Sequence, residues 1–304
     1  TRISEAGTST LAMLQRFVRN QGDGWSWAQD YLGRASYNVV DSHADAAEAL
    51  DGYAEFAAGI GRRLGELHLA LATPGESPMF GIEPAGENDV AAWVEDIRSG
   101  IDAALSMIES ATQWADSRME SDARQLLAQR TDLLAAVPRL AAHGIGTPRT
   151  VIHGDFHLAQ VLVSSGDVFI VDLEGEPSSA TDRRRAKASP LKDLAGLLRS
   201  FDYASMCALS AQPEGGDGIG ARAEWLEDFR RQAAGAAIGA YAAATGRNSD
   251  DFAAGAPAGS LLRLFVLEKA AYEIRYEMAN RPTWAGVPIR GLLGLVDGVI
   301  GEPP

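Results

Sequence analysis

The stretch of sequence that decides the fold runs from residue 151 to residue 177 and reads VIHGDFHLAQVLVSSGDVFIVDLEGEP. Two apolar runs rich in β-branched residues, 161–163 and 168–171, are separated by the sequence Ser-Ser-Gly-Asp. Such a polar, glycine-containing insertion between two β-prone runs is typical of a hairpin turn. The stretch therefore predicts a small antiparallel hairpin.

Four polar side chains stand at the outer ends of these runs. Asp155 and Gln160 precede the first run, and Asp172 and Glu174 follow the second, so the hairpin brings all four to one edge. Phosphoryl transfer in kinases uses an Asp and an amide ligand five positions apart, with a second Asp after the next strand. Asp155 and Gln160 have that separation. The match favours a phosphoryl-transfer site over a surface hairpin flanked by solvated acids.

Composition limits the class of protein. A chain of 304 residues is long enough for one large or two ordinary domains, and its net charge of −14 argues against a nucleic-acid partner. The single cysteine, Cys207, excludes a disulfide framework. No apolar run approaches the roughly 18 residues of a membrane span, and no signal-peptide pattern is visible. We expect a cytoplasmic protein without a membrane partner.

The N-terminal segment predicts a strand over 11–18, followed by a polar, glycine-rich turn and the start of a helix near Trp25. If the central hairpin belongs to a kinase, this strand and turn form the hinge between two lobes. The candidate nucleotide-binding residues there are Gln15, Phe17, Val18 and Asp23. The other interpretation is a strand that leads into an ordinary helix.

Most of the remaining chain has apolar residues at helical spacing. The fold class we predict is predominantly α with a small β-hairpin, α+β overall. The predicted helices cover residues 42–71 with a break near 51–52, 88–114, 119–142, 191–207, 223–245 and 259–279.

The last of these helices carries a dense set of aromatic and hydrogen-bonding side chains. Sugars are held by aromatic faces together with carboxylate, amide and guanidinium groups, since each hydroxyl is both a donor and an acceptor. Beside a catalytic hairpin we interpret the set as a substrate wall; alone it would indicate a solvated helix face. The candidate substrate residues are Tyr272, Glu273, Tyr276, Glu277, Asn280 and Arg281.

Two residues of the predicted helix 191–207 are candidates for structural support. Asp193 and Arg199 are expected to tie this helix to the loop that carries Asp155 through charge-assisted hydrogen bonds. Within that loop, Gly154 lets the backbone approach closely, and His153 is grouped with Asp155 as catalytic.

Several motifs together resemble one family, the actinobacterial maltokinases. The resemblance spans nearly the whole chain. The runs that carry it are NQGDGW at 20–25, HGDFHLAQ at 153–160, VDLEGEP at 171–177, SPLKDLAG at 189–196, RSFDY at 199–203, KAAYEIRYE at 269–277 and NRP at 280–282. The glutamine at 160 and the EGEP run are not general kinase features.

The resemblance implies a eukaryotic-kinase-like fold, related to aminoglycoside and methylthioribose kinases. It also implies use of ATP and Mg²⁺ to convert maltose to maltose 1-phosphate, which feeds α-glucan (glycogen) synthesis from trehalose, with trehalose synthase as a partner or fused domain. By residue, the resemblance implies Asp155 as catalytic base, Gln160 and Asp172 as metal ligands, and Glu174 beside the metal.

The same resemblance divides the chain into two parts. Residues 1–20 correspond to the last strand of a kinase N-lobe and the hinge, and residues 21–304 to the helical C-lobe with the catalytic hairpin. The N-terminal cap and the nucleotide lobe of that family are expected to be absent, as in a fragment of a longer protein. We therefore expect the isolated chain to catalyse weakly, since phosphate positioning supplies much of the rate of such enzymes.

Two alternatives remain open. One is a kinase for another sugar or aminosugar, such as glucosamine or an aminoglycoside. A cationic acceptor needs carboxylates and few arginines, whereas the last helix mixes Lys269, Arg275 and Arg281 with its acids. The other is a non-catalytic sugar-binding fragment.

Overall fold

The computed structural model describes residues 2–4, 7–9, 16–41, 46–75, 77, 79–175, 184, 186–210 and 219–300. Within these residues the chain is predominantly helical, as predicted, and its strands form separate two-stranded sheets. None of the described helices is long and apolar enough to cross a lipid bilayer.

The long helices are α1 (Gly24–Asp41), α2 (Ala46–Ala72), α3 (Glu87–Ser110), α4 (Ser117–Ala128), α5 (Arg130–Ala141), α7 (Leu191–Ser210), α8 (Ile219–Ala244), α9 (Pro257–Asn280) and α10 (Gly286–Ile300). Short 3₁₀ helices are η1 (Leu158–Gln160), η2 (Ser249–Phe252) and η3 (Pro282–Trp284). The strands are β1 (Arg2–Ser4), β2 (Gly7–Ser9), β3 (Glu83–Pro84), β4 (Pro148–Arg149), β5 (Val161–Ser164) and β6 (Asp167–Ile170).

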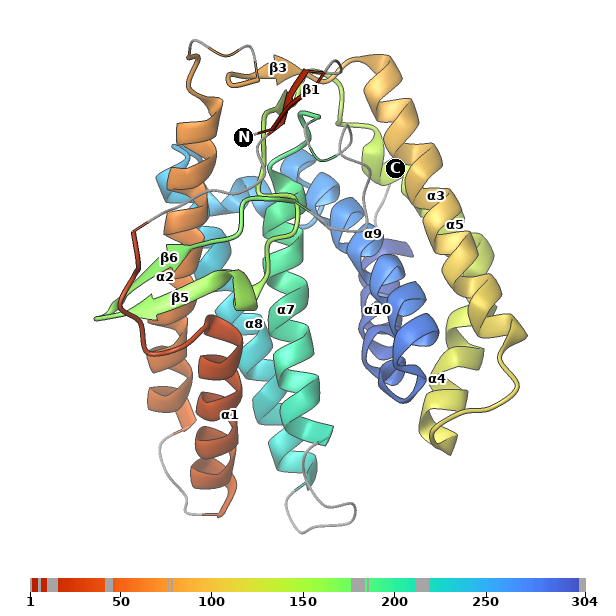
Figure 1. The fold of residues 1–304 in the computed structure, drawn as a ribbon. Helices are drawn as coiled ribbons and strands as arrows, with labels where there is room; N and C mark the ends of the chain where they lie inside the picture. The colour runs from red at the N-terminus through yellow and green to blue at the C-terminus, as the bar shows by residue number, and fades with distance from the viewer. Residues whose placement is uncertain are drawn as a thin grey trace.

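Helix α7 lies in the middle of the molecule (Figure 1). It packs against α1 and α8 on one side and against α9 and α10 on the other, while α3, α4 and α5 form the outer layer beside α9 and α10. Its residues Leu194, Leu197 and Phe201 have no exposed surface. Thirteen of the twenty residues of α7 are buried, so this helix lies at the centre of the core. The loop that carries Asp155 packs against its first turn.

Several predicted boundaries are wrong. The helix predicted over 119–142 is two helices, α4 and α5, because the chain leaves helical geometry at Gln129. Helix α1 continues to Asp41, and α2 passes through Gly52 without a break. Of the predicted strand 11–18, residues 16–18 have no regular secondary structure, and 11–15 lie outside the described residues.

The predicted hairpin is confirmed. Strands β5 and β6 pair antiparallel from Val161 opposite Ile170 to Ser164 opposite Asp167. Ser165 and Gly166 between them both have positive φ, at 51° and 82°, which is the geometry of a tight two-residue hairpin turn. The segment before α1 adds to this sheet, since Gln21 N donates to Val163 O (2.8 Å) and Val163 N to Gly22 O (3.0 Å).

The turn of the hairpin is held against α2 by charge. Arg63 of α2 donates to both carboxylate oxygens of Asp167, and Arg62 reaches the same side chain at 3.4 Å. The Arg63 hydrogen bonds lower the pKa of Asp167 from its ordinary 3.8 to about 2. The hairpin is therefore fixed at its turn as well as at its ends.

We expect this pairing to make stability depend on acidity. A lowered folded-state pKa gives a stabilisation that is present above pH 4 and lost as the pH falls towards 2. Urea unfolding of wild type and Asp167→Asn should therefore differ most near neutral pH, and the difference should shrink as the pH falls from about 4 to about 2.5. A difference that stays constant over this range would contradict the assignment.

The contact between α2 and α8 depends on one glycine. A Cβ on Gly61 would lie 2.1 Å from the carbonyl oxygen of Ala237, whereas a Cβ on Gly59 would meet nothing within 4 Å. Gly61→Ala should lower the free energy of unfolding by about 1–3 kcal/mol through overpacking. Gly59→Ala, on the same helix, should be neutral or raise it by up to about 1 kcal/mol through helix propensity. Urea denaturation of both variants tests this, and equal effects would refute it.

Candidate active site

The loop 151–160, here called the Asp155 loop, is held from below by a buried carboxylate. Asp193, at the start of α7, accepts hydrogen bonds from the backbone N–H groups of His153 (2.7 Å) and Gly154 (2.8 Å). His68 of α2 contributes a third contact, with its Nε2 2.9 Å from Asp193 Oδ2. The other ring nitrogen of His68 lies 3.0 Å from the hydroxyl of Tyr241.

His153 does not face the site. Its side chain is 1% exposed, and its Nε2 lies 2.8 Å from the carbonyl oxygen of Val171. The ring therefore links the Asp155 loop to the residue after β6, which is a positioning contact, and the grouping of His153 with the catalytic residues stays a prediction. Gly154 adopts a φ of +83°, which a residue with a side chain rarely adopts, and this conformation lets the loop turn tightly between His153 and Asp155.

Asp155 lies between two nitrogen-bearing side chains. Lys269 of α9 places Nζ 3.2 Å from Oδ1, and His157 Nε2 is 3.8 Å from Oδ2. The side chain of Asp155 is 16% exposed, so it can be reached from solvent while being held by the protein. A carboxylate in this setting can accept a proton from a hydroxyl group that approaches it.

The predicted metal ligands are partly brought together. Gln160, at the end of η1, donates from Nε2 to Asp172 Oδ2 at 3.2 Å. Asp172 has a φ of 65°, an uncommon conformation for a residue other than glycine that is found at functional sites. Glu174 is exposed, and its backbone carbonyl accepts from Arg184 at 3.3 Å.

Gln160 and Asp172 carry an amide oxygen and a carboxylate, which are the kinds of oxygen donor that Mg²⁺ takes from proteins. Among the described residues no group of three or more His, Cys, Asp or Glu side chains could hold a metal ion by itself. Mg²⁺, however, is commonly bound by one or two protein ligands together with nucleotide phosphates and water. An amide and a carboxylate in contact, Gln160 and Asp172, supply such a donor set.

Of the predicted nucleotide-binding residues, the structure describes Phe17, Val18 and Asp23. Gln15 lies outside the described residues, Phe17 is 80% exposed, and Val18 accepts a hydrogen bond from Asn20 at 2.9 Å. Asp23 accepts from the backbone N–H of Ser26 at 2.8 Å and so caps α1. In this structure its carboxylate caps the start of that helix.

A row of alternating cations and aromatic rings extends from Asp155 along α9 to η3. Lys269 lies 5.0 Å from the ring of Tyr272, and the rings of Tyr272 and Tyr276 stack at 6.2 Å. Arg281 then lies over Tyr276 and Trp284, at 5.7 and 5.4 Å. Tyr276 and Trp284 are about half exposed. We call this set the α9 row.

The two acids predicted to bind substrate face inward instead. Glu273 accepts two hydrogen bonds from Arg199 (2.9 and 2.7 Å), and burial raises the pKa of its carboxyl group in opposition to Arg199. Glu277 is 2% exposed and accepts from the Tyr203 hydroxyl (3.0 Å) and from Arg281. Asn280 donates to the carbonyl of Tyr276.

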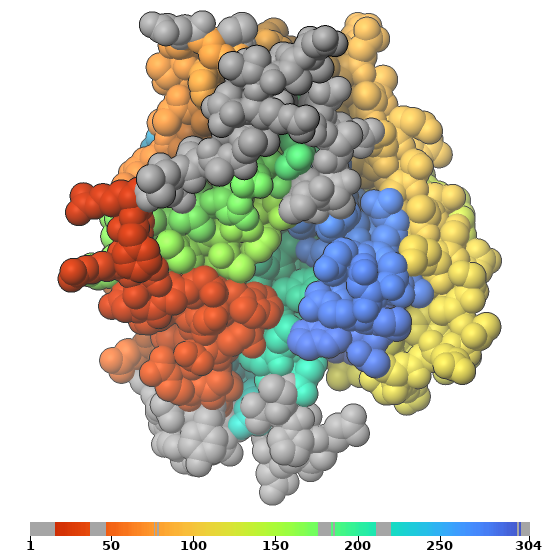
Figure 2. All heavy atoms as spheres, in the orientation of Figure 1, coloured from red at the N-terminus to blue at the C-terminus, as the bar shows by residue number. Residues whose placement is uncertain are grey.

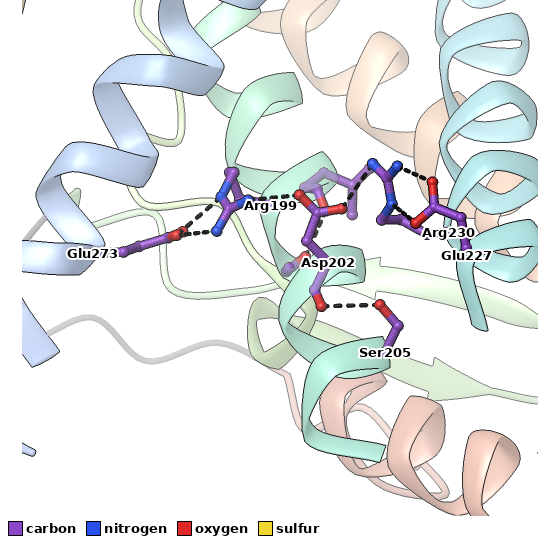
Figure 3. A network of polar contacts seen from close by, with 8 residues as sticks. Arg199, Asp202, Ser205, Glu227, Arg230 and Glu273 are labelled. Atoms are coloured by element: carbon purple, nitrogen blue, oxygen red, sulfur yellow. Dashed lines mark hydrogen bonds and ion pairs between the residues drawn. The ribbon is translucent and has the colours of Figure 1, made fainter. Parts of the chain in front are cut away.

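Arg199 does not bind the Asp155 loop, and that expectation is corrected. Figure 3 shows its guanidinium group between Glu273 of α9 and Asp202 of α7, and Arg230 of α8 between Asp202 and Glu227. A Cβ on Gly291 of α10 would lie 2.5 Å from Arg199 Nη1. The buried guanidinium thus joins α7, α8, α9 and α10, and its position fixes the face of α9 that points outward.

Figure 2 shows one face of the molecule in the orientation of Figure 1. Helix α7 is visible there as a recessed strip between α1 and the C-terminal helices, with the β5–β6 hairpin above it. Sequence reasoning did not assign Lys269 or Trp284 to the site. Lys269 stands one helical turn before Glu273. This spacing puts the two residues side by side on one face of the helix, and it was the sequence signal that could have identified Lys269.

Several solved structures of glucosamine kinase have the same fold as this chain. One, in complex with glucosamine, ADP and inorganic phosphate, superposes with a TM-score of 0.71 and 24% identity over 92% of this chain and 58% of that chain. Another crystal form gives a TM-score of 0.70 with 25% identity over 90% and 56%. The predicted kinase-like, predominantly α fold is confirmed.

Two curated relatives found by sequence similarity are also glucosamine kinases. The glucosamine kinases of Streptacidiphilus jiangxiensis and Mycolicibacterium smegmatis are each 28% identical, over 290 and 287 residues. Both alignments cover 94% of this chain but only 58% and 63% of the relatives, so the chain spans about three fifths of their length. No protein-family model matches the chain. These relatives are sugar kinases, and their names give glucosamine as the substrate, not maltose.

The support beneath the Asp155 loop can be tested by one substitution. Asp193→Asn replaces one carboxylate oxygen by an NH₂ group, so a buried N–H donor loses its acceptor. We expect the free energy of unfolding to fall by about 2–4 kcal/mol. Asp102→Asn, which removes half of an exposed pair with Arg130, should change it by less than about 1 kcal/mol. Chemical denaturation of both variants decides, and equal losses would contradict this role.

Proposed function

We propose that this chain is the acceptor-binding and base-supplying part of an ATP- and magnesium-dependent sugar kinase, with an aminosugar such as glucosamine as acceptor. The observation that carries the proposal is the position of Asp155, whose carboxylate lies at the start of the α9 row. A proton acceptor beside a surface of aromatic and cationic groups is what a sugar hydroxyl needs.

The proposed reaction assigns a task to each group of the chain. Asp155 accepts the proton of the acceptor hydroxyl as that oxygen forms its bond to the γ-phosphorus of ATP. The bond from phosphorus to the β,γ-bridging oxygen breaks, and ADP departs with the electron pair. Asp193 and His153 keep the backbone of the Asp155 loop in place while the proton moves.

Magnesium is the proposed partner of Gln160 and Asp172. When bound, it would neutralise negative charge on the nucleotide phosphates. Glu174 is proposed to lie near it, and Phe17, Val18 and the neighbouring Gln15 remain proposed contacts of the nucleotide base. We assign Asp23 to the capping of α1 in preference to a contact with ribose, because its carboxylate is already hydrogen-bonded to Ser26.

Two observations support a cationic aminosugar over maltose. The characterised relatives are glucosamine kinases, and a chain with net charge −14 attracts a protonated aminosugar but not a neutral disaccharide. Of the cations that the sequence places on α9, Arg281 is paired with Glu277 and Lys269 with Asp155, so their charges are partly compensated within the protein. Tyr272 and Tyr276 are the proposed faces for the sugar ring.

Maltose remains the second candidate, supported by the EGEP run and the other motifs shared with maltokinases. A role in glycogen biosynthesis and an association with trehalose synthase would follow from maltose alone. We propose a cytoplasmic protein in either case. Since the chain spans about three fifths of its relatives, we also propose that it turns over slowly when isolated.

Phosphorylation assays with ATP and magnesium should decide the acceptor. Glucosamine, glucose, maltose and an aminoglycoside are compared with wild type and Asp155→Asn, and calorimetry measures sugar binding without nucleotide. We expect glucosamine to be the best acceptor and turnover to fall at least about 100-fold in the variant, the usual contribution of a general base. Calorimetry should then show that Asp155→Asn still binds the sugar.

Other results have definite meanings. Turnover that survives in Asp155→Asn would contradict the assigned base. Preference for maltose would show that the proposed acceptor is wrong, but it would leave the assignment of the site residues unchanged. Sugar binding without turnover on any acceptor would identify the chain as a binding fragment and refute its proposed catalytic role.

A further inference from the structure

The proposed base already has a cationic partner. Lys269 Nζ is 3.2 Å from Asp155 Oδ1, and the two side chains are only 25% and 16% exposed. A lysine has a long, flexible side chain whose charge is strongly hydrated, and it usually extends into water. The position of the Lys269 ammonium group beside Asp155, and not in water, therefore calls for a functional explanation.

The position of Lys269 is fixed by its helix. Glu273, one helical turn further along α9, is bound to the fully buried Arg199, and this sets the rotation of α9 about its axis (Figure 3). The ring of Tyr272, 5.0 Å from Nζ, adds a cation–π contact. The backbone of Lys269 thus lies on an anchored helix, from which its side chain reaches Asp155.

An aminosugar acceptor creates a problem that Lys269 can solve. Such a sugar presents one ammonium group and several neutral hydroxyls. Hydrogen bonds between ionised groups are about twice as strong as neutral ones, so a bare Asp155 would bind the ammonium group in preference to the hydroxyl that must react. The acceptor would then be bound tightly in an orientation that cannot be phosphorylated.

We infer that Lys269 is a specificity residue that reserves Asp155 for a neutral hydroxyl. Its charge repels a second cation from the same carboxylate but leaves room for a hydroxyl group to donate to it. The amino group of the acceptor is thereby directed away from the point of transfer. This inference rests on the proposed function and deepens it, since it concerns how the acceptor is oriented.

The test compares two sugars that differ at one group. Glucosamine and glucose are titrated calorimetrically, without nucleotide, into wild type, Lys269→Met and Lys269→Arg. We expect Lys269→Met to bind glucosamine about 3- to 10-fold more tightly than wild type, with glucose affinity unchanged. Lys269→Arg, which keeps the charge, should restore the wild-type ratio of the two affinities.

Lys192→Met is the matched control. Lys192 pairs with Glu268, the residue before Lys269, at 2.7 Å, with comparable exposure (29% and 32%) and an aromatic ring 5.2 Å away. The substitution Lys192→Met removes the same charge from the same region of the protein and leaves the pair of Lys269 and Asp155 in place. We expect it to leave the ratio of glucosamine to glucose affinity unchanged.

Kinetics provide a second measurement. Non-productive binding lowers kcat and KM together, so Lys269→Met should lower both for glucosamine relative to glucose. An unchanged affinity ratio in Lys269→Met, or an equal change in Lys192→Met, would overturn the inference while the proposed function stands. Absence of binding of either sugar to wild type would overturn the proposed acceptor and the inference with it.

Discussion

The buried carboxylate of Asp193 is the constraint on which the rest of the site depends. A charged group with 2% exposure is stable only when its oxygens are fully hydrogen-bonded, and Asp193 meets this need with two backbone N–H groups and one histidine. The loop conformation that satisfies Asp193 also sets the position of Asp155, the next residue after the two backbone donors. The functional loop is thus part of the core at one end and part of the surface at the other.

A second buried charge organises the opposite side of α7. Arg199 satisfies its donors with Glu273 and Asp202, and the same carboxylate of Asp202 accepts from Arg230. Burial opposes the charge of Arg199, but Glu273 and Asp202 raise its pKa, so it remains a cation. Asp193 fixes the loop that bears the base and Arg199 fixes the helix that bears the acceptor groups. One helix therefore sets the geometry between them.

The sequence was informative where interactions are local. The β5–β6 hairpin, the spacing of Asp155 and Gln160 and the helical class all follow from short-range patterns, and the structure confirms the hairpin and the class. The partners of Glu273 and Lys269 could not be predicted, because they lie 74 and 114 positions away. Buried residues are spread around most of the circumference of α9 and include Glu277, so its pattern does not say which polar residues face inward. The break at Gln129 carries no Gly or Pro signal.

The division of labour along α9 has a consequence for how such a protein can change over evolutionary time. Glu273 and Glu277 anchor the helix from within, whereas the rings of Tyr276 on α9 and Trp284 on η3 are about half exposed. Substitutions on the outer side can therefore accumulate without disturbing the anchors. A lineage can in this way acquire a new acceptor in small steps, each of which leaves a folded protein with its reactive loop intact.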